Sequence, residues 1–331
     1  MNPLTLWLGE KLGTAAPSRA ALDAHQLRRL RETLAQSLNS RHYRERFRDH
    51  NFSGATAAEV LQALPFSSPS ELRAEPLAFL AVPPDAAERV VTLPTSGTTG
   101  QPKRVYFSAA ELENTAHFFQ FGMQNIARRG GRVMLFMRGG EPGGFAASGG
   151  VCDLVTRAVA RFGCSAVTYG EVDDAEHARA ALLESGADCA VGVAAQMLKI
   201  ARLPGRQPRL KSVLLSADNI PAEIAAELEN RWNCEVFRHY GMTETAFGGA
   251  VDCGAHAGMH IREPDMIFEI IDPISGVVLP DGERGEVVLT TLTRRVMPLV
   301  RYRTGDFSRI IPGDCACGCP LKRLDNVEGH R

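Results

Sequence analysis

Residues 95–103 read Thr-Ser-Gly-Thr-Thr-Gly-Gln-Pro-Lys, and this run is more informative about chemistry than any other part of the chain. It combines hydroxyl side chains with two glycines and ends in a lysine. Hydroxyls, backbone N–H groups beside glycine and an ammonium group are the donors that hold phosphate oxygens. The run therefore predicts a loop that cradles the phosphates of a nucleotide. The predicted phosphate-binding residues are Thr95, Ser96, Gly97, Thr98, Thr99, Gly100 and Lys103.

The spacing of this loop is not that of a Walker A motif. That motif needs four residues between its glycines and a Ser or Thr after the lysine, whereas Gly97 and Gly100 are close and Arg104 follows Lys103. Kinases and GTPases of the Walker type are therefore excluded. The alternative is an ordinary Gly/Thr-rich surface turn, although such turns are usually shorter and rarely end in Pro-Lys.

Two later segments supply further groups that a nucleotide site needs. Residues 239–244 read His-Tyr-Gly-Met-Thr-Glu, and the carboxylate of Glu244 is the kind of ligand that a hard cation bridging phosphates takes. Residues 301–306 read Arg-Tyr-Arg-Thr-Gly-Asp. A carboxylate only accepts hydrogen bonds, so Asp306 can take both hydroxyls of a ribose. Taken alone, Thr-Gly-Asp is an ordinary turn, but its position after the other two segments favours a site.

The three segments together resemble the motifs of the adenylate-forming (acyl-activating, AMP-binding) enzymes. Those motifs are Ser-Gly-Thr-Thr-Gly-x-Pro-Lys, Tyr-Gly-x-Thr-Glu and Tyr-Arg-Thr-Gly-Asp. The resemblance implies that Tyr240 lies against adenine, Thr243 contacts the α-phosphate, Glu244 binds Mg²⁺ and Asp306 binds the ribose. It implies Thr243, Glu244 and Lys103 as catalytic residues. The other nucleotide-binding residues that it implies are Ser216, Ala217, Asp218, His239, Gly241, Met242 and Arg323.

The likeness narrows to the phenylacetate–CoA ligase and coenzyme F390 synthetase branch and covers nearly the whole chain. Residues 42–47, His-Tyr-Arg-Glu-Arg-Phe, are similar to the end of that branch's first long helix, and a helical apolar period over residues 30–47 predicts one helix here. Residues 269–273, Glu-Ile-Ile-Asp-Pro, match its later half. The resemblance implies ATP-dependent activation of a small aryl or acyl carboxylic acid, with release of pyrophosphate. The acid itself is not set by the sequence.

Strand-like and helical segments alternate between residues 132 and 237, which predicts an α/β fold with a mostly parallel sheet flanked by helices. A small β-rich part is expected near the C-terminus. The expected division is an adenylation core over residues 1–325, and a hinge begins at 326–331. Within the core, 1–90 is helical, 91–250 binds nucleotide and 251–325 is β-rich.

Phe145 and Ala146 lie in a glycine-rich connection after the strand expected at 132–137, where the family begins its acyl pocket. The resemblance implies that they line this pocket. A plain strand-to-helix connection is the alternative. For residues 214–218, the alternative to an adenine contact is a buried strand and turn.

Composition excludes several function classes. The chain has 331 residues, 44% of them hydrophobic, and a formal net charge of −1, which offers no electrostatic footprint for nucleic acid or an anionic membrane. No apolar run approaches the roughly 20 residues of a membrane span, and no signal-peptide layout is present. A cytoplasmic location is expected, and the oligomeric state is not set.

The eight cysteines fall into two groups. Four lie within apolar segments and are expected to be buried thiols: Cys152, Cys164, Cys189 and Cys234. The others gather near histidines or on the Gly/Pro-rich run 314–320, Asp-Cys-Ala-Cys-Gly-Cys-Pro. Thiolates with an imidazole in a cytoplasmic chain favour a tetrahedral structural zinc, as the F390 synthetase resemblance also implies. The predicted ligands are Cys253, His260, Cys315 and Cys317.

Alternative zinc ligands remain open. His256 could replace His260, and Cys319 could replace Cys315 or Cys317. Unmetallated surface thiols are the remaining alternative.

The chain departs from the resembled family at its end. The family has a small C-terminal domain whose lysine reaches the acyl carboxylate and the α-phosphate, and residues 323–331 resemble the lead-in to its hinge. A chain cut at the hinge and a protein that naturally consists of the large domain are both open. Adenylation alone, or with a protein partner that lends the missing domain, is expected, whereas the use of CoA is open. The alternative functions are an ATP- or AMP-binding regulatory module and a zinc-stabilised interaction protein.

Overall fold

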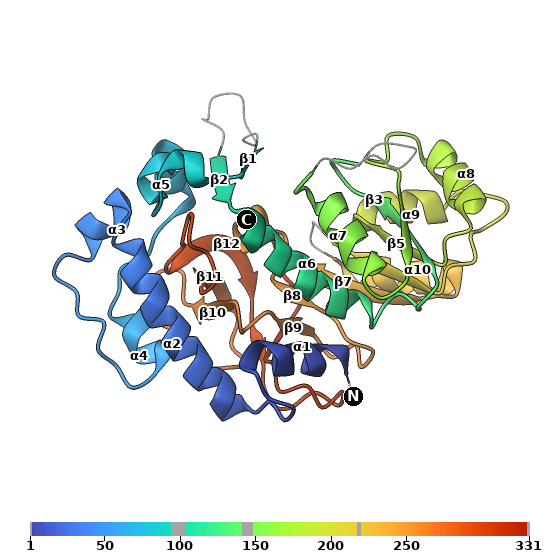
Figure 1. Ribbon diagram of the computed structural model, residues 1–331. Helices are drawn as coiled ribbons and strands as arrows, with labels where there is room; N and C mark the ends of the chain where they lie inside the picture. Colours follow the sequence, from blue (N-terminus) through green and yellow to red (C-terminus); the bar gives the residue numbers. More distant parts are fainter. Residues whose placement is uncertain (1, 94–102, 141–147, 217–219, 330–331) are drawn as a thin grey trace.

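The computed structural model describes residues 2–93, 103–140, 148–216 and 220–329 (Figure 1). The predicted sites at 95–100, Phe145, Ala146, Ala217 and Asp218 lie outside these residues. The α-helices are α1 Pro3–Leu12, α2 Arg19–Ser37, α3 Arg41–Arg46, α4 Ala57–Gln62, α5 Pro69–Ala74, α6 Ala109–Met123, α7 Val151–Ala160, α8 Ala175–Ser185, α9 Ala194–Ala201 and α10 Ala222–Trp232. Short 3₁₀ turns are η1 Pro76–Phe79, η2 Pro84–Ala86 and η3 Thr243–Thr245.

The strands form three sheets. They are β1 Arg89–Leu93, β2 Lys103–Phe107, β3 Arg132–Phe136, β4 Ser165–Thr168, β5 Cys189–Gly192, β6 Ser212–Leu215, β7 Glu235–Tyr240, β8 Ala250–Val251, β9 Met259–Ile261, β10 Met266–Ile271, β11 Gly285–Thr291, β12 Tyr302–Ser308, β13 Ile310–Ile311 and β14 Arg323–Leu324. The largest sheet has the order β13-β14-β9-β8-β7-β6-β5-β3-β4. From β4 to β7 all neighbours are parallel, and the rest of this sheet is antiparallel. Strands β10, β11 and β12 form an antiparallel sheet, and β1 pairs with β2.

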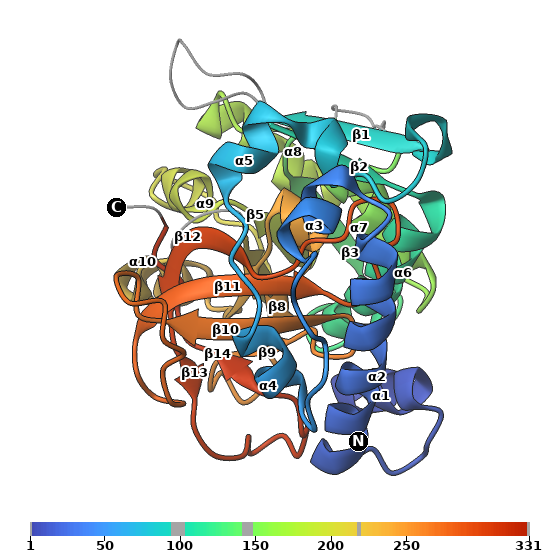
Figure 2. The same ribbon diagram turned by 90° about the vertical axis from the view of Figure 1, so that its left-hand side faces the viewer.

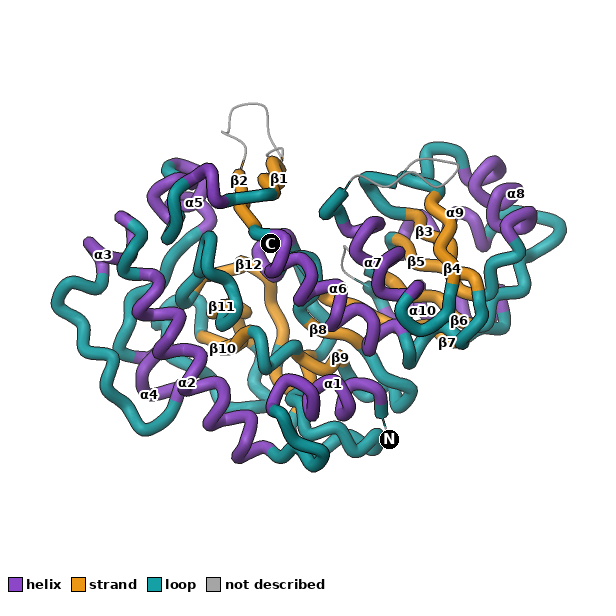
Figure 3. The backbone as a smooth tube through the Cα atoms, viewed as in Figure 1, coloured by secondary structure: helices purple, strands orange, loops and turns teal. Residues whose placement is uncertain are grey.

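Both faces of the parallel strands are buried. On β3, Val133 and Leu135 pack into one apolar core with residues of α6 and α7, and Met134 and Phe136 pack into a second core with residues of α8, α9 and α10. This follows from the two-residue period of a strand, which sends successive side chains to opposite faces. Figure 3 shows the helices on the two sides of these strands. The predicted α/β fold with a flanked parallel sheet is confirmed.

The N-terminal helix prediction is wrong in one respect. The single helix expected over residues 30–47 is two helices, because α2 ends at Ser37 and α3 begins at Arg41. Ser40 adopts an extended conformation and its hydroxyl accepts a hydrogen bond from the Tyr43 N–H at 3.3 Å. A serine in this role caps a helix N-terminus. The apolar period of the sequence therefore continues across the end of one helix and the start of the next.

The molecule has two lobes that the chain joins through α6 and β7 (Figure 1). One lobe holds the helices α1 to α5 and the sheet of β10, β11 and β12, and the other holds the parallel strands with α7 to α10. Figure 2 shows α2 and α3 in front of the first lobe, beside its sheet. The hydroxyl of Thr33 in α2 donates to the carbonyl of Leu292 at 3.2 Å, just beyond β11.

None of the helices in the described ranges combines the length and the apolar composition needed to span a bilayer. Cys152, Cys164 and Cys189 are buried, as predicted, whereas Cys234 is only half-buried. Burial raises the pKa of the Cys152 thiol to about 11, so this thiol is protonated at neutral pH. The division of the chain at residues 90, 250 and 325 stays a prediction.

Candidate active site

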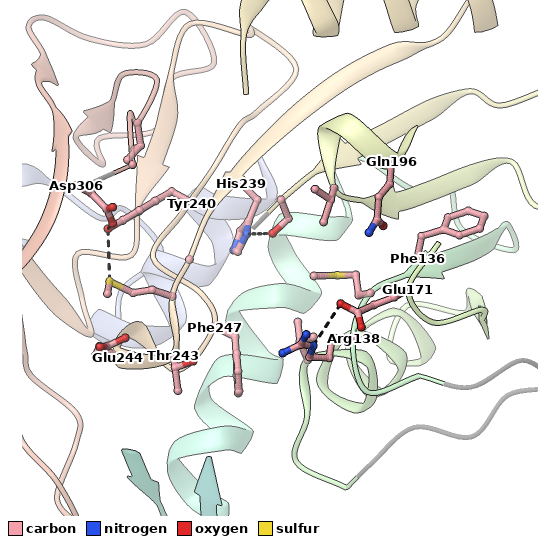
Figure 4. Close-up of a pocket in the computed structure, with 18 of the residues that line it drawn as sticks. Phe136, Arg138, Glu171, Gln196, His239, Tyr240, Thr243, Glu244, Phe247 and Asp306 are labelled. Carbon is pink, nitrogen blue, oxygen red and sulfur yellow. Dashed lines mark hydrogen bonds and ion pairs between the residues drawn. The ribbon is translucent and has the colours of Figure 1, made fainter. Parts of the chain in front are cut away.

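A cavity of about 610 Å³ lies at the carboxyl ends of the parallel strands (Figure 4). Ligands of open α/β sheets bind at such ends. Strands β3, β6 and β7 contribute residues at or just after their ends, and β12 contributes Asp306 from the other lobe. The predicted nucleotide-site residues that line it are Lys103, Ser216, His239, Tyr240, Gly241, Met242, Thr243, Glu244 and Asp306.

The turn after β7 has little freedom. A Cβ atom on Gly241 would lie 2.1 Å from the carbonyl oxygen of Phe247, so only glycine fits this close approach of two backbone segments. The hydroxyl of Thr245 accepts from the N–H of Met242 at 3.0 Å. Ala246 and Phe247 have positive φ angles of 52° and 70°, which cost free energy in residues with a side chain. Such strain is typical of functional sites, and here it bends the chain so that Thr243 and Glu244 line the cavity.

Glu244 is the centre of the most buried polar contact in this cavity. Its side chain is 1% exposed, and its Oε1 accepts a hydrogen bond from the Tyr302 hydroxyl at 2.9 Å. The Lys103 ammonium forms an ion pair with the same oxygen. Burial and the neighbouring Glu244 charge raise the pKa of Tyr302, so its hydroxyl keeps its proton and donates. A carboxylate held in this way beside a cation has the chemistry of a metal-binding group.

Arg294 fixes the backbone around Glu244. One guanidinium nitrogen donates to the carbonyl of Glu244 at 3.0 Å, and another donates to the carbonyl of Tyr106 at 2.8 Å. The guanidinium also lies 4.5 Å from the ring centroid of Phe107, a cation–π distance. Arg294 therefore ties the turn that carries Glu244 to β2, the strand that begins with Lys103.

Tyr302 and Arg294 were not predicted as site residues. Tyr302 stands in the Tyr-Arg-Thr-Gly-Asp segment, and its place 58 residues after Glu244 in the chain gave no sign of the contact. Arg294 has no motif around it.

A second contact joins the two lobes across the cavity. The Tyr240 hydroxyl, at the end of β7, donates to Asp306 Oδ2 on β12 at 2.8 Å. Burial, followed by the charge of Asp306, raises the pKa of Tyr240 well above its usual value. The tyrosine therefore stays neutral, and its aromatic ring and the Asp306 carboxylate face the same space (Figure 4). A flat apolar surface beside a diol acceptor suits a nucleoside.

A small apolar cavity of about 30 Å³ adjoins the larger one. The two cavities share Met137, Val151, Ser216 and His239. The remaining wall is hydrophobic and comes from α6, α7 and the strands: Phe118, Phe119, Gly122, Met123, Val155, Val191, Leu214 and Val251. An apolar side chain attached to a polar reacting group would be accommodated by this pair of cavities.

The prediction that Arg323 binds the nucleotide is wrong, because the structure does not bring this residue to the nucleotide cavity. It lies on β14, which pairs with β9, and its guanidinium donates to the carbonyls of Ala257 at 2.7 Å and Gly313 at 2.9 Å. These hydrogen bonds hold the loops around the cysteine cluster.

The four predicted zinc ligands lie together. The ligand atoms of Cys253, His260, Cys315 and Cys317 are all within 4.8 Å of one another. The Sγ atoms of Cys253 and Cys315 are 3.8 Å apart, and a tetrahedral zinc with Zn–S bonds of about 2.3 Å separates two sulfurs by about 3.8 Å. Cys317 Sγ is 3.2 Å from His260 Nε2.

The surroundings of the cluster favour this set over the alternatives. His260 Nδ1 lies 3.1 Å from the carbonyl oxygen of Leu321, which fixes the tautomer that leaves Nε2 free to coordinate. His256 is exposed, and its ring is tilted by 48° against that of Phe237, with the centroids 4.6 Å apart. The Cys319 N–H lies 3.4 Å from Cys317 Sγ as a donor. The donor set therefore fits a structural zinc.

Comparisons with known proteins agree with this geometry. A profile of the AMP-binding enzyme family matches residues 22–293. The phenylacetate-coenzyme A ligase of Pseudomonas putida is 29% identical over 324 residues, which cover 94% of this chain and 71% of that protein. The enzyme of the same name from Thermus thermophilus is 28% identical, over 84% of this chain and 62% of its own.

A solved structure has the same fold. It is 2-hydroxyisobutyryl-CoA ligase in complex with 2-HIB-AMP and CoA, with a TM-score of 0.81 at 20% identity, over 94% of this chain and 69% of that one. At this identity the likeness concerns the fold alone. Since the family profile spans most of the sequence, the chain belongs to the AMP-binding enzyme family.

Proposed function

We propose that this protein activates a small carboxylic acid with ATP, forming an acyl adenylate and releasing pyrophosphate. The observation that carries the proposal is the convergence, in one cavity, of a buried carboxylate–lysine pair and a tyrosine–aspartate pair, next to an apolar side cavity. The phenylacetate-coenzyme A ligase relatives support the same reaction class.

The nucleoside would lie in the space that Tyr240 and Asp306 both face. Tyr240 offers its ring to the adenine, and Asp306 accepts hydrogen bonds from the ribose hydroxyls. The Tyr240 hydroxyl already holds the Asp306 carboxylate in place at 2.8 Å. This preorganisation lowers the cost of ordering the two side chains when ATP binds.

The phosphates would lie near Lys103, Thr243 and Glu244. The Lys103 ammonium pairs with Glu244 in this structure, in the place that a cation bound to that carboxylate would take. When Mg·ATP binds, Lys103 exchanges Glu244 for phosphate oxygens, and Thr243 donates to the α-phosphate. Bound Mg²⁺ would neutralise phosphate charge beside Glu244, whose orientation Tyr302 and Arg294 maintain.

The reaction needs an acid whose carboxylate faces the α-phosphate. A carboxylate oxygen attacks the α-phosphorus, a new P–O bond forms, and the bond to the leaving pyrophosphate breaks. The side chain of the acid would point toward the apolar side cavity, while its carboxylate faces the phosphate-binding residues. The protein contributes positioning and charge neutralisation. An aryl or short acyl group suits the hydrophobic wall, which includes Phe118 and Phe119.

We also propose that Cys253, His260, Cys315 and Cys317 bind a structural zinc. With four protein ligands, such a zinc has no open position for water. Its role would be to tie the 315–317 loop to His260 on β9 and to Cys253, which follows β8.

The test of the proposed function is ATP–pyrophosphate exchange with phenylacetate, benzoate and short-chain acids. We expect exchange that depends on the acid, and a loss of about 100-fold or more in Glu244→Gln and Lys103→Ala. Arg231→Gln is a matched control, because Arg231 makes an exposed ion pair with Glu227 on α10, outside the cavity. ATP binding without exchange for every acid would contradict the proposal.

A further inference from the structure

His239 stands where the two cavities meet and has one unused polar atom. It lines both cavities, and its side chain is 7% exposed. Its Nδ1 is 2.9 Å from the Ser216 hydroxyl, as Figure 4 shows by a dashed line. Its Nε2 is buried and makes no hydrogen bond to any described residue. The ring also meets Phe119 edge-on, with centroids 5.7 Å apart.

An orphaned polar atom of this kind calls for a physical explanation. Buried polar groups are nearly always paired, because a lost hydrogen bond to water is not replaced. No described residue replaces that partner for Nε2, and the wall of the side cavity beyond Ser216 and His239 is hydrophobic. A ligand in the larger cavity that carries a polar group to the place where the two cavities meet would supply the missing partner.

The charge of His239 limits what that polar group is. Burial lowers the pKa of His239 to about 4, so the imidazole is neutral at pH 7 and offers no positive charge. A carboxylate would gain little beside it and has Lys103 in the larger cavity. Ser216 can donate to Nδ1 or accept from it. Nε2 therefore either donates or accepts, and both suit a neutral hydroxyl.

We propose that His239 selects acids whose acyl group carries a neutral hydrogen-bonding substituent, such as a hydroxyl, that reaches Nε2 where the two cavities meet. This inference rests on the proposed function and narrows its substrate class. A site with a buried polar group rejects analogues that lack the matching group, because the site's own atom then stays unpaired. The plain apolar acid is therefore the poorer substrate.

The experiment compares acids that differ only by hydroxyl against methyl. The probes are 2-, 3- and 4-hydroxyphenylacetate with the corresponding tolylacetates, and mandelate with 2-phenylpropionate. The readouts are kcat/KM for ATP–pyrophosphate exchange and equilibrium binding of each acid by calorimetry. For at least one pair we expect the wild-type protein to prefer the hydroxyl member by about 10-fold or more. His239→Leu should bring that ratio close to one, chiefly by raising KM for the hydroxyl acid.

Two further variants separate the polar contact from cavity shape. Met123→Leu alters the wall of the same cavity without a polar atom, and it should keep the wild-type ratio within about twofold. Ser216→Ala removes the partner of Nδ1 and should lower the ratio only in part. If His239→Leu fails to fold, His239→Gln, which keeps a polar group, gives the comparison.

The outcomes separate this inference from the proposed function. No exchange with any acid counts against the proposed function, and calorimetry with the same pairs then decides the inference. A hydroxyl-to-methyl ratio near one for every pair in the wild-type protein overturns the inference, whatever the variants do. A clear preference that persists in His239→Leu overturns it as well.

Discussion

Replacing Tyr302 by phenylalanine removes one oxygen atom from the most buried contact of the candidate active site. Tyr302 is fully buried and donates to Glu244 Oε1 at 2.9 Å. A hydrogen bond to a charged group contributes about 1.5–3 kcal/mol net. We therefore expect Tyr302→Phe to lower the free energy of unfolding by about 2 kcal/mol, as measured by urea denaturation.

The same change should impair function, because Lys103 is then the one remaining partner of the Glu244 carboxylate among the described residues. A carboxylate free to rotate binds its cation less well and aligns it less often. We expect acid-dependent pyrophosphate exchange to fall about 10-fold, which corresponds to about 1.4 kcal/mol of transition-state free energy.

Tyr43→Phe is the matched control. Tyr43 is equally buried, and its hydroxyl accepts from the Val300 N–H at 2.9 Å. Its loss leaves a buried N–H unpaired, at a cost of about 1–3 kcal/mol, but does not touch Glu244. Equal loss of stability in the two variants, with exchange within twofold of wild type in both, would refute the positioning role of Tyr302.

Three further predictions concern the metal cluster, pH and the core. The protein should hold one zinc per chain by plasma mass spectrometry and lose it in Cys317→Ser but not in Cys234→Ser; zinc-free protein from metal-replete medium would contradict this. Burial lowers the pKa of His239 from 6.5 to about 4. Between these pH values the unfolded chain binds a proton that the folded chain does not, so the free energy of unfolding decreases as the pH is lowered. His239→Leu should reduce that decline by about 2.4 kcal/mol in urea titrations at pH 7 and pH 4.5, and an unchanged decline would contradict the prediction. Arg301→Gln leaves the buried carboxylate of Glu269 without its ion pair, which should cost about 3–5 kcal/mol of unfolding free energy; a loss below 1 kcal/mol would show that the pair is dispensable.

The alternating elements were predictable because each has a local signature. The alternation predicted between residues 132 and 237 is present as strands β3 to β7 and helices α7 to α10. Apolar periods and turn residues act within a few positions, so one chain displays them. The break between α2 and α3 was missed because the period runs through it, whereas the cap at Ser40 depends on a single hydroxyl.

The site was predictable only as a set of motifs. Glu244, Tyr240 and Asp306 were identified from the sequence, and the structure brings them to one cavity. The hydrogen bond from Tyr302 to Glu244 joins residues 58 positions apart. Such a contact depends on how β12 packs near the turn after β7, which no local pattern encodes.

The role of Arg323 and the choice between His256 and His260 as zinc ligand also depend on strand pairing that the local sequence does not encode. Arg323 was grouped with the nucleotide site because its segment resembles a hinge lead-in, but the pairing of β14 with β9 turns it toward the cysteine loops. The sequence analysis favoured His260 as a zinc ligand and left His256 as the alternative. The pairing of β9 buries His260, while His256 remains exposed in a left-handed turn with φ 48°.

The most direct test of the central claim is to detect the adenylate itself. The protein is mixed with Mg·ATP and phenylacetate or a hydroxyphenylacetate at single-turnover concentrations, and the quenched mixture is analysed by mass spectrometry. We predict an acid-specific acyl-AMP mass together with one equivalent of pyrophosphate, both absent with Glu244→Gln. ATP that stays intact with every acid, while calorimetry shows that it is bound, would contradict the account.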